Sequence, residues 1–92
     1  MAVTEAVIAR CVEILRAHGA RRVILFGSAL DSPETAADLD LAAEGLEGRA
    51  FFRAGAEAER IAGVPLDLIP LDPPTPFSAY IERKGRTLFG KD

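Results

Sequence analysis

The sequence predicts an α/β fold, in which a small mixed sheet of three to four strands is flanked by helices. Residues 3–18 and 49–62 carry apolar side chains at helical spacing, and a glycine follows each segment. Short apolar runs between and after these segments have the length and composition of buried strands. Because helical and extended segments alternate along the chain, helices packed against one sheet are expected.

The first half of the chain is expected to contain two strands after its opening helix. Residues 22–26 form a short apolar run that ends at Gly27 and suits a central strand. Residues 28–35 predict a turn or short helix, with Ser28 as a candidate N-cap. Residues 38–42 alternate between acidic and apolar side chains, which is the pattern of a strand with one buried face.

The second half is expected to contain a helix, a strand, a shorter helix and a final extended segment. A turn over 44–48 leads into the helix over 49–62, and residues 64–69 form the third strand. Prolines then mark a stiff connection before a short helix over 77–84 that stops at a glycine. Residues 87–89 form the terminal extended segment.

Length and composition indicate a single small domain over residues 1–92. A chain of this length buries only about 60–65% of the surface that its unfolded form exposes. Hydrophobic residues nevertheless make up 49% of the sequence, which is more than a small core requires. This surplus favours assembly into a homo- or hetero-oligomer.

Charge and cysteine content limit the classes of partner. The net charge of −3 argues against direct binding to a nucleic-acid polymer, which needs a basic surface. The one cysteine, Cys11, cannot form an internal disulfide, and this favours a cytoplasmic location. The first ten residues include Glu5 and lack the apolar run of a secretory signal. No segment approaches the roughly 20 apolar residues that span a bilayer, so no membrane association is expected.

Three aspartates are the candidate catalytic and metal-binding residues. Asp38 and Asp40 lie two residues apart on one expected strand, so both side chains project from the same face. Asp67 lies on the next expected strand. A third carboxylate beside such a pair is unfavourable unless a cation neutralises it. The pattern therefore predicts a divalent-metal site that faces a phosphate, although the solvated face of an edge strand would also carry alternating charge.

Gly27 and Ser28 are the candidate nucleotide-binding residues. Because it has no side chain, Gly27 would let the backbone approach a triphosphate closely. The backbone N–H groups of the following turn and the Ser28 hydroxyl would donate hydrogen bonds to phosphate oxygens. Alternatively, the pair is a strand-ending glycine followed by a helix cap. Phe51, Phe52 and Phe77 are expected to pack rather than to stack on a nucleobase.

Four segments of the sequence carry a combined pattern. They are Val-Ile-Leu-Phe-Gly-Ser-Ala at 23–29, Asp-Leu-Asp-Leu at 38–41, Pro-Leu-Asp-Leu-Ile at 65–69, and the end of the chain over 81–89. Their spacing resembles the DNA-polymerase-β-like nucleotidyltransferase superfamily and, within it, the minimal nucleotidyltransferases, or MNT proteins. The resemblance covers about residues 20–90 and implies the nucleotidyltransferase fold.

The resemblance implies Mg²⁺-dependent transfer of AMP from ATP to a protein hydroxyl, with release of pyrophosphate. Asp38 and Asp40 would hold Mg²⁺, and Asp67 would bind a second Mg²⁺ ion and accept the proton of the attacking hydroxyl. Family members of this size are commonly antitoxins of HEPN-domain toxins. They neutralise the toxin by binding it and, in some cases, by attaching AMP to a tyrosine. The implied partners are therefore a HEPN toxin and ATP.

The loop after the Gly27–Ser28 pair departs from the family pattern. Family members usually carry an arginine there, whereas this chain has Leu30 and Asp31. Acidic charge beside a docking triphosphate is unfavourable unless metal ions or a partner compensate it. A second hypothesis is therefore an antitoxin that neutralises its toxin by stoichiometric contact, with a degenerate nucleotide site. A third is a regulatory subunit that senses nucleotide without turnover.

Overall fold

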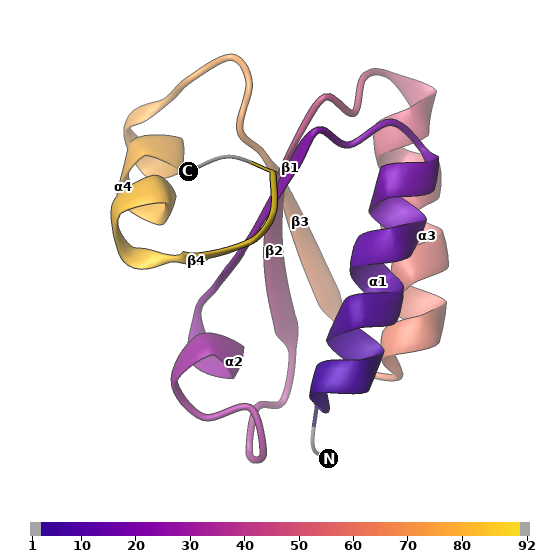
Figure 1. Cartoon of the computed structure of the whole chain (residues 1–92), viewed down its shortest axis with the longest axis vertical. Helices are drawn as coiled ribbons and strands as arrows, with labels where there is room; N and C mark the ends of the chain where they lie inside the picture. The colour runs from indigo at the N-terminus through magenta and orange to yellow at the C-terminus, as the bar shows by residue number, and fades with distance from the viewer. Residues whose placement is uncertain (1–2, 91–92) are drawn as a thin grey trace.

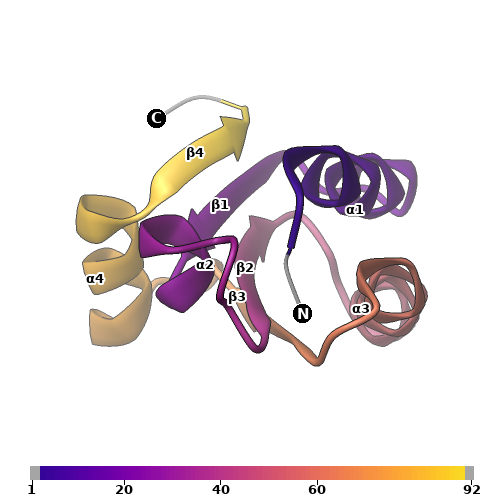
Figure 2. The same ribbon diagram turned by 90° about the horizontal axis from the view of Figure 1, so that it is seen from below.

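A four-stranded mixed sheet separates two layers of helices (Figure 1). The computed structural model describes residues 3–90. Helices α1 and α3 pack side by side on one face of the sheet, and α4 crosses the other face (Figure 2). In chain order the elements are α1 (Glu5–Ala17), β1 (Arg22–Phe26), α2 (Ser28–Asp31), β2 (Leu39–Glu44), α3 (Arg49–Ala62), β3 (Leu66–Pro70), α4 (Pro76–Lys84) and β4 (Arg86–Phe89).

The strands lie in the order β3-β2-β1-β4, which confirms the predicted mixed sheet. Strand β1 is antiparallel to both β2 and β4, whereas β2 and β3 are parallel. A parallel pair needs a long crossover connection, and α3 supplies it. The terminal segment over 87–89, expected only as an extended piece, belongs to the edge strand β4.

Local sequence signals fix the ends of the helices. The side-chain oxygen of Thr4 caps α1. Helix α4 begins at Pro76, one residue before the predicted start, because Thr75 and Ser78 form a reciprocal capping box. Gly63 ends α3 in the left-handed conformation, with a φ of 72°. Among residues 3–90, no helix has the length and apolar content needed to cross a membrane.

Strands β2 and β3 are shifted towards the C-terminus of their predicted segments. Strand β2 begins at Leu39 and continues to Glu44, because its last residues still pair with β1. Strand β3 begins at Leu66 rather than at residue 64, because its pairing with β2 starts there. Asp38 therefore lies directly before β2 and not within it.

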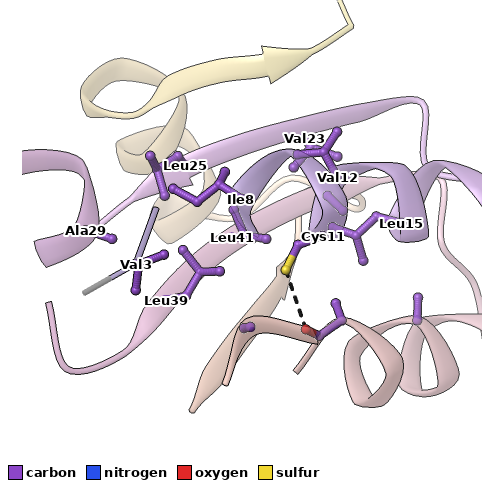
Figure 3. Packing of buried hydrophobic residues seen from close by; sticks show 14 of the residues in the cluster. Val3, Ile8, Cys11, Val12, Leu15, Val23, Leu25, Ala29, Leu39 and Leu41 are labelled. Atoms are coloured by element: carbon purple, nitrogen blue, oxygen red, sulfur yellow. Dashed lines mark hydrogen bonds between the residues drawn. The ribbon is translucent and has the colours of Figure 1, made fainter. Parts of the chain in front are cut away.

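The larger hydrophobic core lies between the sheet and the α1–α3 layer (Figure 3). Leu39 and Leu41 are fully buried in this core. The thiol of Cys11 donates a hydrogen bond to the Ala58 carbonyl at 3.4 Å and so joins α1 to α3. Burial raises the pKa of that thiol. Since Leu39 and Leu41 point into the core, Asp40 between them points to the opposite face of the sheet.

A smaller core lies under α4 on that opposite face and contains Ile24, Ala42, Leu71 and Ile81. The predicted stop of α4 at Gly85 is confirmed, but its φ of −81° is not left-handed. A Cβ atom added at Gly85 would lie 2.8 Å from the Ile81 carbonyl oxygen and 2.9 Å from that of Leu25. A glycine is needed there because the chain passes closely over β1 between α4 and β4.

Candidate active site

Two aspartates face each other across neighbouring strands on the α4 side of the sheet. Asp40 on β2 is the register partner of Asp67 on β3, and the two carboxyl groups are close enough to share a hydrogen bond. A hydrogen bond between two carboxyl groups requires a proton on one of them. The structure therefore brings two of the three predicted metal-binding residues into direct contact.

Asp38 lies at the entrance to β2, beside the segment that follows β1. The Ser28 hydroxyl donates to Oδ1 of Asp38 at 3.5 Å, which is a long and weak hydrogen bond. Asp38 is two residues from Asp40, and its charge acts on the Asp40 carboxyl group. All three aspartates thus gather with Ser28 at the end of the sheet where β1 ends and where β2 and β3 begin.

Gly27 is required at this end of the sheet for two separate reasons. Its φ of 78° and ψ of −159° belong to a region that only glycine adopts readily. A Cβ atom at this position would also overlap the Asp40 carboxylate, and would lie 3.0 Å from Cγ of Asp40. The expectation that Ser28 caps α2 is wrong, because Gly27 occupies the N-cap position and Ser28 is the first helical residue. The Ser28 hydroxyl points to Asp38 instead.

The carboxyl groups of the site repel one another. Burial is the largest cause of a raised Asp40 pKa, followed by the charges of Asp38 and Asp67 and by the hydrogen bond with Asp67. All of these causes favour the protonated form of Asp40. A bound cation would offset the repulsion between the ionised carboxylates. Closely spaced carboxylates that repel one another without a cation are typical of cation-binding sites.

The three aspartates suit Mg²⁺ by the chemistry of their donor atoms. Among residues 3–90, no three His, Cys, Asp or Glu side chains lie together in a group that could by itself hold a metal ion. Asp38 contacts Ser28, whereas Asp40 contacts Asp67. Mg²⁺ prefers carboxylate oxygens, keeps several of its waters and is usually shared with substrate phosphates, so it does not require a full protein cage. The residues that would hold the ion are Asp38, Asp40 and Asp67.

The aspartates lie on an open part of the surface. Two surface pockets, of about 250 and 450 Å³, lie elsewhere: one between α1 and β4, the other beside the C-terminal end of α4. None of the three aspartates lines either pocket. Asp67 is exposed, while Asp38 and Asp40 are half-buried. A substrate held by an open site would remain accessible to a second macromolecule.

Two aromatic side chains lie near the aspartates: Phe26, which the sequence analysis did not consider as a site residue, and Phe77, which it expected only to pack. Phe26 on β1 is the register partner of Asp40. Its ring contacts the ring of Phe77 on α4, with centroids 5.9 Å apart and planes at 87°. Phe77 still exposes 49% of its surface. The position of Phe26 directly before Gly27 was an available signal, but the approach of Phe77 depends on how α4 crosses the sheet.

Comparison with known proteins places this geometry among nucleotidyltransferases. No family model and no curated protein sequence matches the chain. A solved structure assigned as a minimal nucleotidyltransferase is 30% identical, with a TM-score of 0.70 over 92% of this chain and 94% of the other. The chain is also similar to a complex of a tri-AMPylated Shewanella oneidensis HEPN toxin with its MNT antitoxin, at 18% identity and a TM-score of 0.74 over 95% and 72%.

A third similar structure is a toxin–antitoxin complex with AMP-PNP, at 19% identity and a TM-score of 0.76, which covers 91% of this chain and 73% of the other. The likenesses below 20% identity show the shared fold. The 30% identity over nearly the whole of both chains shows the family. Together with the mixed sheet, the glycine–serine corner and the aspartates beside it, these matches lead to one conclusion. The chain belongs to the minimal nucleotidyltransferases.

Proposed function

We propose that the protein is a Mg²⁺-dependent nucleotidyltransferase that transfers AMP from ATP to a hydroxyl group of a HEPN-domain toxin and acts as its antitoxin. A tyrosine is the proposed acceptor. The observation that carries this proposal is the pairing of Asp40 with Asp67 across β2 and β3, at the end of the sheet where Gly27 approaches Asp40 and Ser28 contacts Asp38. Carboxylates next to a close-approach glycine are the combination that a metal-bound triphosphate requires.

The similar structures support the antitoxin role and the transfer of AMP in this proposal. One contains a HEPN toxin that carries AMP, bound to an MNT antitoxin, and another holds AMP-PNP in a toxin–antitoxin complex. The open position of the aspartates supports a macromolecular acceptor, since a tyrosine on another protein must reach the α-phosphate directly. The net charge of −3 favours a nucleotide over a nucleic-acid polymer as the substrate.

In the proposed reaction, the acceptor oxygen forms a bond to the α-phosphorus, the bond from that phosphorus to the bridging oxygen breaks, and pyrophosphate leaves. Gly27 and Ser28 would position the phosphates through close backbone approach and the Ser28 hydroxyl. Asp67, the most exposed of the three carboxylates, would accept the proton of the acceptor hydroxyl. Bound Mg²⁺ would be held by the three aspartates, and would neutralise phosphate charge and stabilise the attacking and leaving oxygens.

Transfer of label from ATP tests this proposal. The protein is incubated with Mg²⁺, the product of the adjacent gene, and ATP labelled at either the α- or the γ-phosphate. AMP transfer leaves only the α-label on the partner, because the bond between the α- and β-phosphates breaks. We expect α-label alone on the partner and none when EDTA replaces Mg²⁺. Incorporation of γ-label, or of neither label, would reject the proposed activity.

A second candidate function is neutralisation of the toxin by stoichiometric contact. The structure of α2 favours it, because Leu30 packs against the core and the exposed Asp31 adds negative charge to the helix that starts at Ser28. The four residues of α2 include no basic side chain that could face a triphosphate. A triple Asp38→Asn, Asp40→Asn and Asp67→Asn variant separates the two functions. If it still rescues growth of cells that express the partner toxin, contact is sufficient; loss of rescue with retained binding supports catalysis.

A further inference from the structure

An exposed aromatic ring lies on the same face of the sheet as Asp40 and Asp67. Phe77, in the first turn of α4, exposes 49% of its surface although a benzene ring gains free energy from burial. It lies on the face of the sheet that carries Asp40 and Asp67, because its partner Phe26 belongs to the small core under α4. The other strongly exposed aromatic rings lie elsewhere: Phe52 is on α3 in the opposite layer, and Tyr80 is further along α4, where Arg83 lies over its ring.

Phe26 links this ring to the aspartates. Along one row of the sheet, Phe26 on β1, Asp40 on β2 and Asp67 on β3 are register partners. Side chains of directly paired residues lie about 4.5–5.5 Å apart at Cβ. The edge-to-face contact of 5.9 Å between Phe26 and Phe77 therefore sets Phe77 directly beside this row.

The local structure holds Phe77 in a fixed position. Thr75 and Ser78 form the capping box that starts α4, with hydrogen bonds of 3.0 and 2.8 Å, and Pro76 occupies the first helical position. One edge-to-face neighbour supports Phe77 and leaves part of the ring uncovered. A rigid, partly uncovered ring loses little conformational entropy when a flat partner stacks on it.

The direction of a bound nucleotide follows from the glycine–serine corner. In the proposed site, Gly27 and Ser28 hold the outer phosphates and the aspartates hold the α-phosphate. The ribose and base would then extend from the α-phosphate on the side opposite the outer phosphates. Phe26 lies in the aspartate row itself, beside Asp40, and the Phe77 ring on α4 contacts it, whereas Ser28 starts α2 beyond the end of β1. The exposed Phe77 ring is therefore the aromatic surface available to a base on the α4 face of the sheet.

We propose that Phe77, supported by Phe26, is the surface on which the nucleobase of the substrate stacks. This inference rests on the proposed nucleotidyltransferase function and adds the element that binds the base. Stacking on one aromatic ring accepts any base, because each base has a flat π-face, so Phe77 contributes affinity more than selectivity among bases.

Calorimetric titration in Mg²⁺ tests this role with two probes, ATP and inorganic tripolyphosphate. Phe77→Leu retains apolar contact with Phe26 but removes the aromatic face, and Phe77→Tyr retains both. We expect Phe77→Leu to weaken ATP binding about tenfold, within the roughly 5- to 150-fold range for loss of one stacking contact, and to leave tripolyphosphate binding unchanged. Phe77→Tyr is expected to bind both probes as the wild type does. Phe52→Ala serves as the control for loss of an exposed aromatic ring.

The two probes separate failure of this inference from failure of the proposed function. Equal loss of ATP and tripolyphosphate affinity in Phe77→Leu, or no loss of either, would overturn the stacking role while leaving the phosphate site intact. Weaker binding to the toxin partner with unchanged ATP affinity would also overturn it, because Phe77 would then contact protein. If the wild type binds neither probe in Mg²⁺, the proposed function and this inference fall together.

Discussion

Replacement of Asp40 by asparagine is expected to lower AMP transfer by about 10³-fold or more and, at the same time, to raise the thermal stability of the metal-free protein at neutral pH. The first effect follows because metal ions contribute several kcal/mol to stabilisation of the transition state, at about 1.4 kcal/mol for each factor of ten. The second follows because Asp40 is partly buried between Asp38 and Asp67, which repel its charge. Asparagine retains the shape without the charge.

The stability effect has a defined pH dependence. Burial and the neighbouring carboxylates raise the pKa of Asp40 in the folded protein above its ordinary value. The folded state then binds the Asp40 proton more tightly than the unfolded state, so this contribution to stability is complete at low pH. It is lost as the pH rises through the raised pKa. Asparagine does not ionise, so Asp40→Asn does not lose stability in this way. Its melting temperature should exceed that of the wild type at pH 7 and equal it in acid.

Thermal unfolding in EDTA across this pH range measures the difference. Asp72→Asn is a suitable control, because Asp72 lies beyond the opposite end of β3 and makes only a 3.9 Å ion pair with Arg21. It should leave AMP transfer unchanged and should not stabilise the protein at pH 7. A melting temperature for Asp40→Asn below that of the wild type at every pH would contradict the account of charge repulsion.

Gly27→Ala is expected to reduce AMP transfer about 10²-fold and to destabilise the fold by about 1–3 kcal/mol. The φ of 78° and ψ of −159° would strain an alanine backbone. The new methyl group would also overlap the Asp40 carboxylate and displace it from Asp67. Misplacement of a reacting group by about 1 Å can cost a factor of 10² in rate. Denaturant unfolding and the α-label assay measure the two effects.

Gly48→Ala provides the matched control. Gly48 also has a positive φ, of 56°, and precedes a helix, but an added Cβ there would have no heavy atom within 4 Å. Its substitution should therefore cost comparable stability through backbone strain and leave transfer per folded molecule unchanged. If both alanine variants lose activity to the same extent, the loss at Gly27 reflects general destabilisation rather than contact with Asp40.

The helices and the central strand could be predicted because their signals are local. β1 and α3 have the bounds expected from the apolar run at 22–26 and the periodicity at 49–62. The alternation of Asp38, Leu39 and Asp40 identified the buried and polar faces, since the leucine contributes only to the core. The ends of β2 and β3 were shifted because strand length is determined by pairing with neighbours, which the strand's own sequence does not contain.

The residues of the candidate site come from the sequence, whereas their contacts could not be predicted from it. Asp40 meets Asp67 through a parallel register that depends on how α3 returns the chain, and the Leu39 N–H that donates to the Pro65 carbonyl at 2.9 Å continues this pairing before the strand. The contact of Phe26 with Phe77 likewise depends on the path of α4 across the sheet. Contacts between segments far apart in the chain cannot be read from the local periodicity of either segment.

The central claim is that Asp38, Asp40 and Asp67 jointly hold a divalent cation against a nucleotide whose phosphates lie at Gly27. A crystal structure with Mn²⁺ and a non-hydrolysable ATP analogue tests it most directly, because Mn²⁺ gives an anomalous signal at its own position. We predict an anomalous peak bounded by the three carboxylates, with the triphosphate at the glycine–serine corner. Nucleotide bound elsewhere, or density at that corner with no Mn²⁺ peak and with Asp67 turned away from Asp40, would contradict the account.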